Sequence, residues 1–235
     1  MDKTIATLHQ AVAKIPDGAT IMIGGFGGSG APVELIHVLI DHGAKHLTVI
    51  NNNAGNGHVG LAALIEQGQV DRLICSFPRS ADPRVFTERY LDGRITLDIV
   101  PQGTLAERIR AGGAGIPAFY TPTGFGTTLA EGKQIEEFDG RHYVRERWLK
   151  ADFALIKAEC ADPHGNLTYR RAARNFNPIM ATAATTTLVQ TSHIVPLGAI
   201  DPDHVITPGI FVNHIVHVPN PAQEEDLNRQ EAVYP

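Results

Sequence analysis

The amino-acid sequence predicts an α/β fold: an open, mainly parallel sheet with helices on both faces and a small inserted β-hairpin. Short apolar runs rich in β-branched residues alternate with helical patterns over the first two-thirds of the 235 residues, as in repeated βαβ units. Such apolar strands are typical of a parallel sheet that is covered on both faces. A chain of this length can also bury a sizeable core.

The first part of the chain contains four such strands with helical patterns before and between them. Apolar residues recur at helical spacing near the N-terminus, at Ile5, Leu8, Val12 and Ile15, and predict an amphipathic helix. Strands are expected at 19–23, 46–51, 71–76 and 95–100, and helices at 4–14, 32–42, 59–67, 83–91 and 103–111.

The segment 112–132 interrupts this alternation. Its glycines and prolines leave little room for regular structure and predict a shaped loop. Residues 133–138 and 141–148 flank Asp139-Gly140, a pair typical of a type I′ turn, so a hairpin is expected at about 133–148. The core should resume with strands at 153–156, 167–169 and 186–191 and a helix near 178–184.

Residues 1–218 are expected to form a single domain, followed by a tail. Residues 219–235 contain three prolines, four acidic residues and few apolar residues that would anchor them to the core. This composition predicts a flexible C-terminal tail.

Composition and charge argue against several classes of function. The formal net charge of −5 and the isoelectric point of about 6.1 predict no nucleic-acid partner. No apolar stretch reaches the ~18–20 residues of a membrane span, and no secretory signal is evident, so no membrane partner is expected. Cys75 and Cys160 are isolated, which favours a reducing cytoplasm. His214 and His217 do not have metal-ligand spacing on a strand, and no metal site is expected.

The most informative segment is 17–32. A β-branched run precedes five glycines within the seven residues 24–30, and Pro32 then opens a helical pattern. Glycine allows positive φ angles and close approach of a ligand to the backbone. A strand, a glycine loop and a helix N-terminus together direct N–H groups at one point, which suits a phosphate, a carboxylate or an oxyanion. The spacing Gly25-x-Gly27-x-x-Gly30 also fits a dinucleotide motif, although such matches often occur by chance.

Three segments together resemble one family. Asp17-Gly18, Gly24-Gly25-Phe26, Gly30 and Pro32 are similar, in order, to the signature of the first of the two subunits of class I coenzyme A transferases. Asn51-Asn52-Asn53-Ala54-Gly55 and the run from Pro101 to Gly115 resemble two further segments of that family. The likeness extends from about residue 3 to residue 218.

The resemblance implies acyl exchange through covalent catalysis. In that family a glutamate carboxylate attacks an acyl-CoA thioester, and a mixed anhydride and a glutamyl-CoA thioester follow. The glutamate lies in a Ser-Glu-Asn-Gly sequence of the second (B) subunit, which this chain lacks. We therefore expect no catalytic nucleophile here. The B subunit would supply it as the partner, in an A2B2 assembly, with coenzyme A or succinyl-CoA as substrate and no permanently bound cofactor.

The resemblance also indicates which residues line the site. The glycine loop is expected to bind coenzyme A, and side-chain amides at the carboxyl edge of the sheet are expected to support the reaction. For the asparagines, turn formation alone is the alternative. The loop residues are Gly24, Gly25, Phe26, Gly27, Gly28, Ser29 and Gly30, and the supporting residues are Asn52, Asn53 and Gln102.

Other charged residues have two interpretations. Glu34, Glu66, Glu107 and Glu131 are candidate carboxylates, but structural roles are favoured for all four. The cluster Arg170, Arg171, Arg174 suits the phosphates of coenzyme A or a dicarboxylate. Salt bridges at a subunit interface are the slightly preferred interpretation of the same cluster.

Within the family, the segments 75–79, 166–170 and 206–212 are most similar to enzymes that move coenzyme A from succinyl-CoA to 3-oxoadipate. Enzymes that use acetoacetate are the alternative. A different class, a nucleotide-binding oxidoreductase, would need an acidic residue after the second strand, where Asn51 to Asn53 stand instead. A sugar-phosphate sensor without catalytic activity is a third possibility.

Overall fold

The computed structural model describes residues 1–234. Its main sheet follows the order β11-β10-β8-β1-β2-β3-β4, and all neighbouring strands on this path are parallel. The predicted open parallel sheet is confirmed. The strands are β1 (Thr20–Ile23), β2 (Leu47–Ile50), β3 (Val70–Cys75), β4 (Thr96–Ile99), β8 (Ala151–Ala161), β10 (Ala184–Ile194) and β11 (His214–His217), with β9 (Leu167–Thr168) antiparallel to β8.

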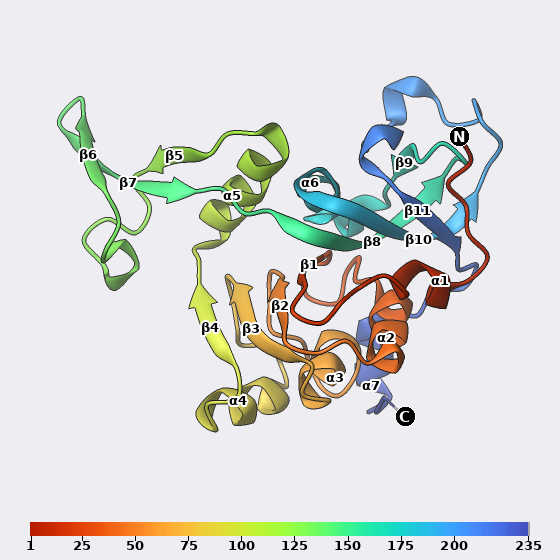
Figure 1. Cartoon of the computed structure of the whole chain (residues 1–235), viewed down its shortest axis with the longest axis horizontal. Helices are drawn as coiled ribbons and strands as arrows, with labels where there is room; N and C mark the ends of the chain where they lie inside the picture. The colour runs from red at the N-terminus through yellow and green to blue at the C-terminus, as the bar shows by residue number, and fades with distance from the viewer. Residues whose placement is uncertain (235) are drawn as a thin grey trace.

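Helices cover both faces of this sheet (Figure 1). One core cluster includes Ile21 and Ile23 and packs against α1 to α4, whereas the other includes Met22 and packs against α5 and α6. Successive side chains of β1 therefore enter opposite cores, as the period of two requires. The helices are α1 (Leu8–Val12), α2 (Val33–His42), α3 (Gly60–Glu66), α4 (Arg84–Leu91), α5 (Gln102–Ala114), α6 (Asn177–Ala183) and α7 (Glu224–Arg229).

The first helix is shorter than the expected range 4–14. Thr7 caps it, because its hydroxyl accepts from the backbone N–H of Gln10 while the Gln10 side chain accepts from the backbone of Thr7. Before this capping box, Thr4 forms a parallel bridge with Ile215 of β11 instead of joining a helix.

The inserted hairpin is present and belongs to a three-stranded antiparallel sheet of order β5-β7-β6 that projects from one end of the molecule (Figure 1). Its strands are β5 (Ala118–Thr121), β6 (Ile135–Phe138) and β7 (Arg141–Arg147). Asp139 and Gly140 have φ angles of 51° and 73°, so both turn residues are left-handed, as a type I′ turn requires.

The expectation of a loop without regular structure at 112–132 is wrong at its start. Helix α5 continues to Ala114, and β5 begins at Ala118. A Cβ on Gly112 would lie 2.0 Å from the carbonyl oxygen of Leu149, and one on Gly113 would lie 2.1 Å from Oγ1 of Thr182. These glycines therefore permit close packing of a helix rather than a turn.

Residues 219–234 fold back onto the domain. The Ala222 N–H donates to Oε1 of Glu34 at 2.5 Å, and Nζ of Lys157 donates to the Ala222 carbonyl at 3.1 Å. Near the end of the chain, the Tyr234 N–H donates to the carbonyl of His58. Tyr234 also packs against the hydrophobic core, so polar and apolar contacts both anchor the tail. The predicted flexibility concerns motion and stays a prediction.

Within residues 1–234, no helix has the length and apolar character that a membrane crossing requires. Over the same residues, no three His, Cys, Asp or Glu side chains gather as a metal site would need.

Candidate functional site

A cavity of about 710 Å³ opens at the carboxyl ends of β1, β2 and β3. Ligands bind at this edge in open α/β sheets because the loops that leave parallel strands converge there. The cavity brings together residues from all three predicted groups, namely the glycine loop, the asparagine segment and the start of α5. Its lining includes Phe26, Gly27, Gly28, Asn52, Asn53, Asn56, Ser76, Phe77, Arg79, Ser80, Ala81, Gln102, Glu224, Glu225 and Asn228.

Asn52 is held in one orientation in the cavity wall. Its Oδ1 accepts two hydrogen bonds, from Oγ of Ser76 at 2.7 Å and from Nε2 of Gln102 at 2.9 Å. Both acceptor positions are thus used, and Nδ2 has no hydrogen-bond partner within residues 1–234. The residue is 4% exposed and lines the cavity. Its amide N–H groups are therefore fixed donors toward a ligand oxygen.

Asn51 and Asn53 hold the backbone around Asn52. Nδ2 of Asn51 donates to the carbonyl of Ile23 at 2.8 Å, and Oδ1 of Asn51 accepts from the Asn53 N–H at 2.8 Å. Asn53 in turn accepts from the N–H of Gly55 and donates to the Gly27 carbonyl at 3.4 Å. The turn-forming alternative thus applies to Asn53, although this residue also lines the cavity.

The glycine loop is a tight hairpin. The N–H of Phe26 donates to the Ser29 carbonyl at 3.0 Å, and the N–H of Ser29 donates to the Phe26 carbonyl at 3.1 Å. Gly27, with a φ of 57°, and Gly28 form its tip and line the cavity together with Phe26. A β-branched or bulky residue would be strained at Gly27.

The remaining loop glycines face protein. A Cβ on Gly24 would lie 1.9 Å from Oδ1 of Asn177, and one on Gly30 would lie 2.5 Å from the carbonyl oxygen of Ala173. Gly25, with a φ of 123°, lies against Ala31. Ser29 and Gly30 line a second cavity of about 620 Å³. Coenzyme A binding by all seven loop residues stays a prediction, and only Phe26, Gly27 and Gly28 reach the main cavity.

At the N-terminus of α2, one backbone N–H that could bind an anion is used within the protein. The N–H of Leu35 donates to Oε1 of Gln190 at 3.1 Å, and Nε2 of Gln190 donates to Glu34. The N–H of Leu35, one of the free N–H groups at the start of the helix, is thus satisfied within the protein. A pyrophosphate bound to this N–H, as in a dinucleotide-binding oxidoreductase, would have to displace Gln190, and anion binding at this helix end stays a prediction.

Sequence patterns did not indicate the contribution of α7. Glu224, Glu225 and Asn228 line the cavity, and a Cβ on Gly28 would lie 2.9 Å from Cγ of Glu225. Burial, together with the charge of Glu225, raises the pKa of Glu224 to about 7. The tail has few apolar residues, so its sequence gave no signal for this packing.

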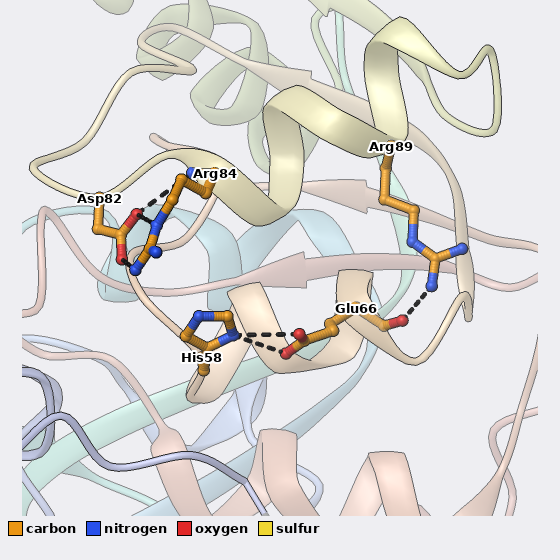
Figure 2. A network of polar contacts seen from close by, with 5 residues as sticks. All are labelled: His58, Glu66, Asp82, Arg84 and Arg89. Atoms are coloured by element: carbon orange, nitrogen blue, oxygen red, sulfur yellow. Dashed lines mark hydrogen bonds and ion pairs between the residues drawn. The ribbon is translucent and has the colours of Figure 1, made fainter.

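None of the four glutamates considered from the sequence lines the main cavity. Glu66 pairs with His58 at 3.1 Å, as Figure 2 shows, and Glu107 pairs with Arg110 at 2.6 Å. Glu34 bonds with Gln190 and the tail. Arg170 and Arg171 line the second cavity, together with Ser29 and Gly30.

Comparison with known proteins assigns the chain to a family. A family model described as Coenzyme A transferase matches residues 5–218. The chain belongs to the coenzyme A transferase family. The A subunit of the 3-oxoadipate CoA-transferase of Acinetobacter baylyi is 59% identical over 218 residues, which cover 93% of this chain and 96% of that protein. The A subunit of a probable succinyl-CoA:3-ketoacid coenzyme A transferase of Bacillus subtilis is 48% identical, covering 92% of this chain and 90% of its own length.

Solved structures show the same fold. The glutaconate coenzyme A-transferase of Acidaminococcus fermentans superimposes with a TM-score of 0.82 at 22% identity, over 92% of this chain and 76% of that one. The family match and the 59% identical relative make the chain an enzyme subunit of the transferase family, and the cavity that carries Asn52 and Gln102 is the candidate active site.

Proposed function

We propose that this chain is the A subunit of a two-subunit transferase that moves coenzyme A from succinyl-CoA to 3-oxoadipate. The observation that carries the proposal is the amide of Asn52, a residue that lines the cavity and whose oxygen accepts two hydrogen bonds, so that its N–H groups stay available to a ligand. The 59% identity to the corresponding subunit of a 3-oxoadipate CoA-transferase supports this choice of acid. The Bacillus subtilis relative is named for a 3-ketoacid, so a smaller 3-oxo acid such as acetoacetate is the competing acceptor.

The reaction begins when a glutamate carboxylate from the partner attacks the thioester carbonyl carbon of succinyl-CoA. Charge develops on the carbonyl oxygen, where Nδ2 of Asn52 stabilises it. The C–S bond then breaks, and the thiolate leaves behind a mixed anhydride. Attack of the thiolate on the glutamyl carbonyl releases succinate and gives a glutamyl-CoA thioester. The carboxylate of 3-oxoadipate reverses these steps and leaves as its CoA thioester.

A partner subunit is supported by the small sheet. Large apolar side chains remain exposed on or beside it, including Tyr120, Phe125, Ile135 and Phe138. An exposed apolar patch of this kind marks a protein contact. The proposed assembly holds two copies of each subunit, which the mass of the purified complex tests. The free thiols of Cys75 and Cys160 are consistent with a cytoplasmic location.

The test compares the chain alone with the chain co-expressed with its partner. The chain alone should give no 3-oxoadipyl-CoA from succinyl-CoA and 3-oxoadipate, whereas the complex should give it faster than acetoacetyl-CoA from acetoacetate. Trapping with borohydride after incubation with acyl-CoA should modify the partner only. Because Glu225 lines the cavity, a Glu225→Ala variant tests whether this glutamate, rather than one of the partner, is the nucleophile. Modification of this chain, or its activity alone, would refute the assignment of the nucleophile.

A further inference from the structure

Arg79 is the one cationic side chain among the residues that line the main cavity. It is exposed, and none of the ion pairs within residues 1–234 includes it. Its guanidinium group therefore keeps its donors available for an anionic ligand.

The loop that carries Arg79 is attached to the site at its start. The N–H groups of Ser76 and Phe77 both donate to the Asn52 carbonyl at 3.1 Å, and Oγ of Ser76 binds the Asn52 side chain. Arg79 follows Ser76 by three positions, so their Cα atoms lie at most about 11 Å apart. A ligand held at the amide of Asn52 is thus within reach of the long side chain of Arg79.

The end of the same loop is attached as well. Oδ1 of Asn56 accepts from the Asp82 N–H at 2.7 Å, and the Asp82 carbonyl accepts from the N–H of Gly57 at 3.1 Å. Pro78 restricts the backbone directly before Arg79. The loop is therefore held on both sides of Arg79 by the segment that follows β2.

Unlike Arg79, two neighbouring arginines have hydrogen-bond partners within residues 1–234 of the protein. Arg84 forms two hydrogen bonds of 2.7 Å with the carboxylate of Asp82, and Arg89 donates to the backbone carbonyl of Glu66 (Figure 2). Arg84 lines a neighbouring cavity, not the main one. Structural contacts thus occupy both of these guanidinium groups, whereas Arg79 lines the main cavity without a carboxylate partner in the described part of the chain.

We propose that Arg79 binds the distal carboxylate of the acyl group and so selects dicarboxylic over monocarboxylic 3-oxo acids. The inference rests on the proposed function and names the determinant of its substrate class. Succinyl and 3-oxoadipyl groups both carry a carboxylate at the end away from the thioester, and an acetoacetyl group has none. The reacting carbonyl lies at Asn52, the distal carboxylate pairs with Arg79, and the exposed rings of Phe26 and Phe77 line the space for the methylene groups.

The charges of the cavity make this cation necessary. Glu224 and Glu225 on α7 are the acidic residues in its lining, and both disfavour a bound dianion when ionised. Glu225 also has Arg229 at 3.8 Å, but the side chain of Arg229 is largely exposed and lies outside the lining. Among the lining residues, attraction for a second carboxylate therefore depends on Arg79.

The test is an Arg79→Gln variant in the complex with the partner subunit, with Arg84→Gln as the control that removes a nearby arginine. In ping-pong kinetics, kcat/KM for an acceptor acid reports only its reaction with the CoA-loaded enzyme. Arg79→Gln should lower kcat/KM for 3-oxoadipate about 10- to 100-fold, the usual effect of a lost charged hydrogen bond, and lower that for succinyl-CoA similarly. The value for acetoacetate should change less than twofold, and Arg84→Gln should retain the preference of the wild type.

A second substrate gives an independent readout. The ester of 3-oxoadipate with its distal carboxyl group methylated should react equally well with wild type and Arg79→Gln. Equal losses in kcat/KM for 3-oxoadipate and acetoacetate would indicate that Arg79 binds coenzyme A instead, and would overturn the inference. No loss in kcat/KM for either acid would also overturn it. If the wild-type complex transfers coenzyme A to neither acid, the proposed function itself fails.

Discussion

Nε2 of Gln102 lies 2.9 Å from Oδ1 of Asn52, although the two residues are 50 positions apart in the chain. The contact joins the first residue of α5 to the loop that follows β2. Together with Ser76, it fixes the orientation of the Asn52 amide, so that the nitrogen rather than the oxygen is available to a ligand. A carbonyl oxygen bound at this point of the wall therefore meets an N–H donor.

Replacement of Asn52 by alanine, in the complex with the partner, removes the donor that we assign to the oxyanion. The loss of one such donor lowers kcat by about 10²–10³-fold, and we expect kcat/KM for succinyl-CoA to fall by that factor. Steady-state kinetics would measure it, with the exposed amide variant Gln67→Ala as the control. A loss below threefold for Asn52→Ala would contradict the role of this amide.

Replacement of Gln102 by alanine in the same complex frees one lone pair of Asn52 Oδ1 without removing the donor. The bond from Ser76 remains, so the expected loss in kcat/KM is smaller, about tenfold, as for a typical hydrogen bond. Because Gln102 acts through Asn52, the double variant should be no slower than Asn52→Ala alone. Losses that multiply would show instead that Gln102 acts on the substrate directly.

Gly24→Ala should destabilise the isolated chain by about 1–3 kcal/mol, the usual cost of overpacking. Its Cβ would meet Oδ1 of Asn177, a fully buried side chain that accepts from the Lys157 N–H and donates to the Ala173 carbonyl. Urea unfolding would measure the change. Gly103→Ala is the matched control, because no atom lies within 4 Å of its added Cβ. Equal stabilities of the two variants would disprove this account of Gly24.

Docking of α7 should weaken as the pH rises. Burial raises the pKa of Glu224 from its ordinary value of 4.5 to about 7. Between these values the undocked carboxyl ionises first, so the docked state binds more protons and loses stability with increasing pH up to about 7. Hydrogen-exchange protection factors for residues 219–234 should therefore be lower at pH 8 than at pH 5. Glu224→Gln should abolish this difference, whereas the exposed Glu231→Gln should retain it.

Lys157→Met should release the start of the tail. Burial lowers the pKa of Lys157, while the charge of Glu34 opposes this effect, and its Nζ donates to the Ala222 carbonyl. Loss of a charged hydrogen bond should lower protection factors in the tail about 10- to 100-fold. The exposed Lys14→Met serves as the control. Unchanged protection would show that Glu34 alone holds Ala222.

Local patterns were sufficient to predict most of the fold. Alternating apolar strands and amphipathic helices specified a parallel sheet covered on both faces, and Asp139-Gly140 specified the hairpin turn. These features depend on neighbouring residues, which is why patterns reveal them. The glycines at 112 and 113 were misread as loop residues because their function is to admit Leu149 and Thr182, which are distant in the sequence.

Part of the candidate site, too, could be predicted from the sequence, and part could not. The family resemblance, together with the order of residues along the chain, predicted that the glycine loop, the asparagines after β2 and Gln102 lie in one region, since parallel strands bring their carboxyl ends together. Which atoms face the cavity emerged only from the folded chain: Gly24 and Gly30 pack against protein, Gln190 accepts from the Leu35 N–H in the first turn of α2, and Glu224 enters from the tail. Hydrogen bonds and close contacts between distant segments set these orientations, and no local pattern records them.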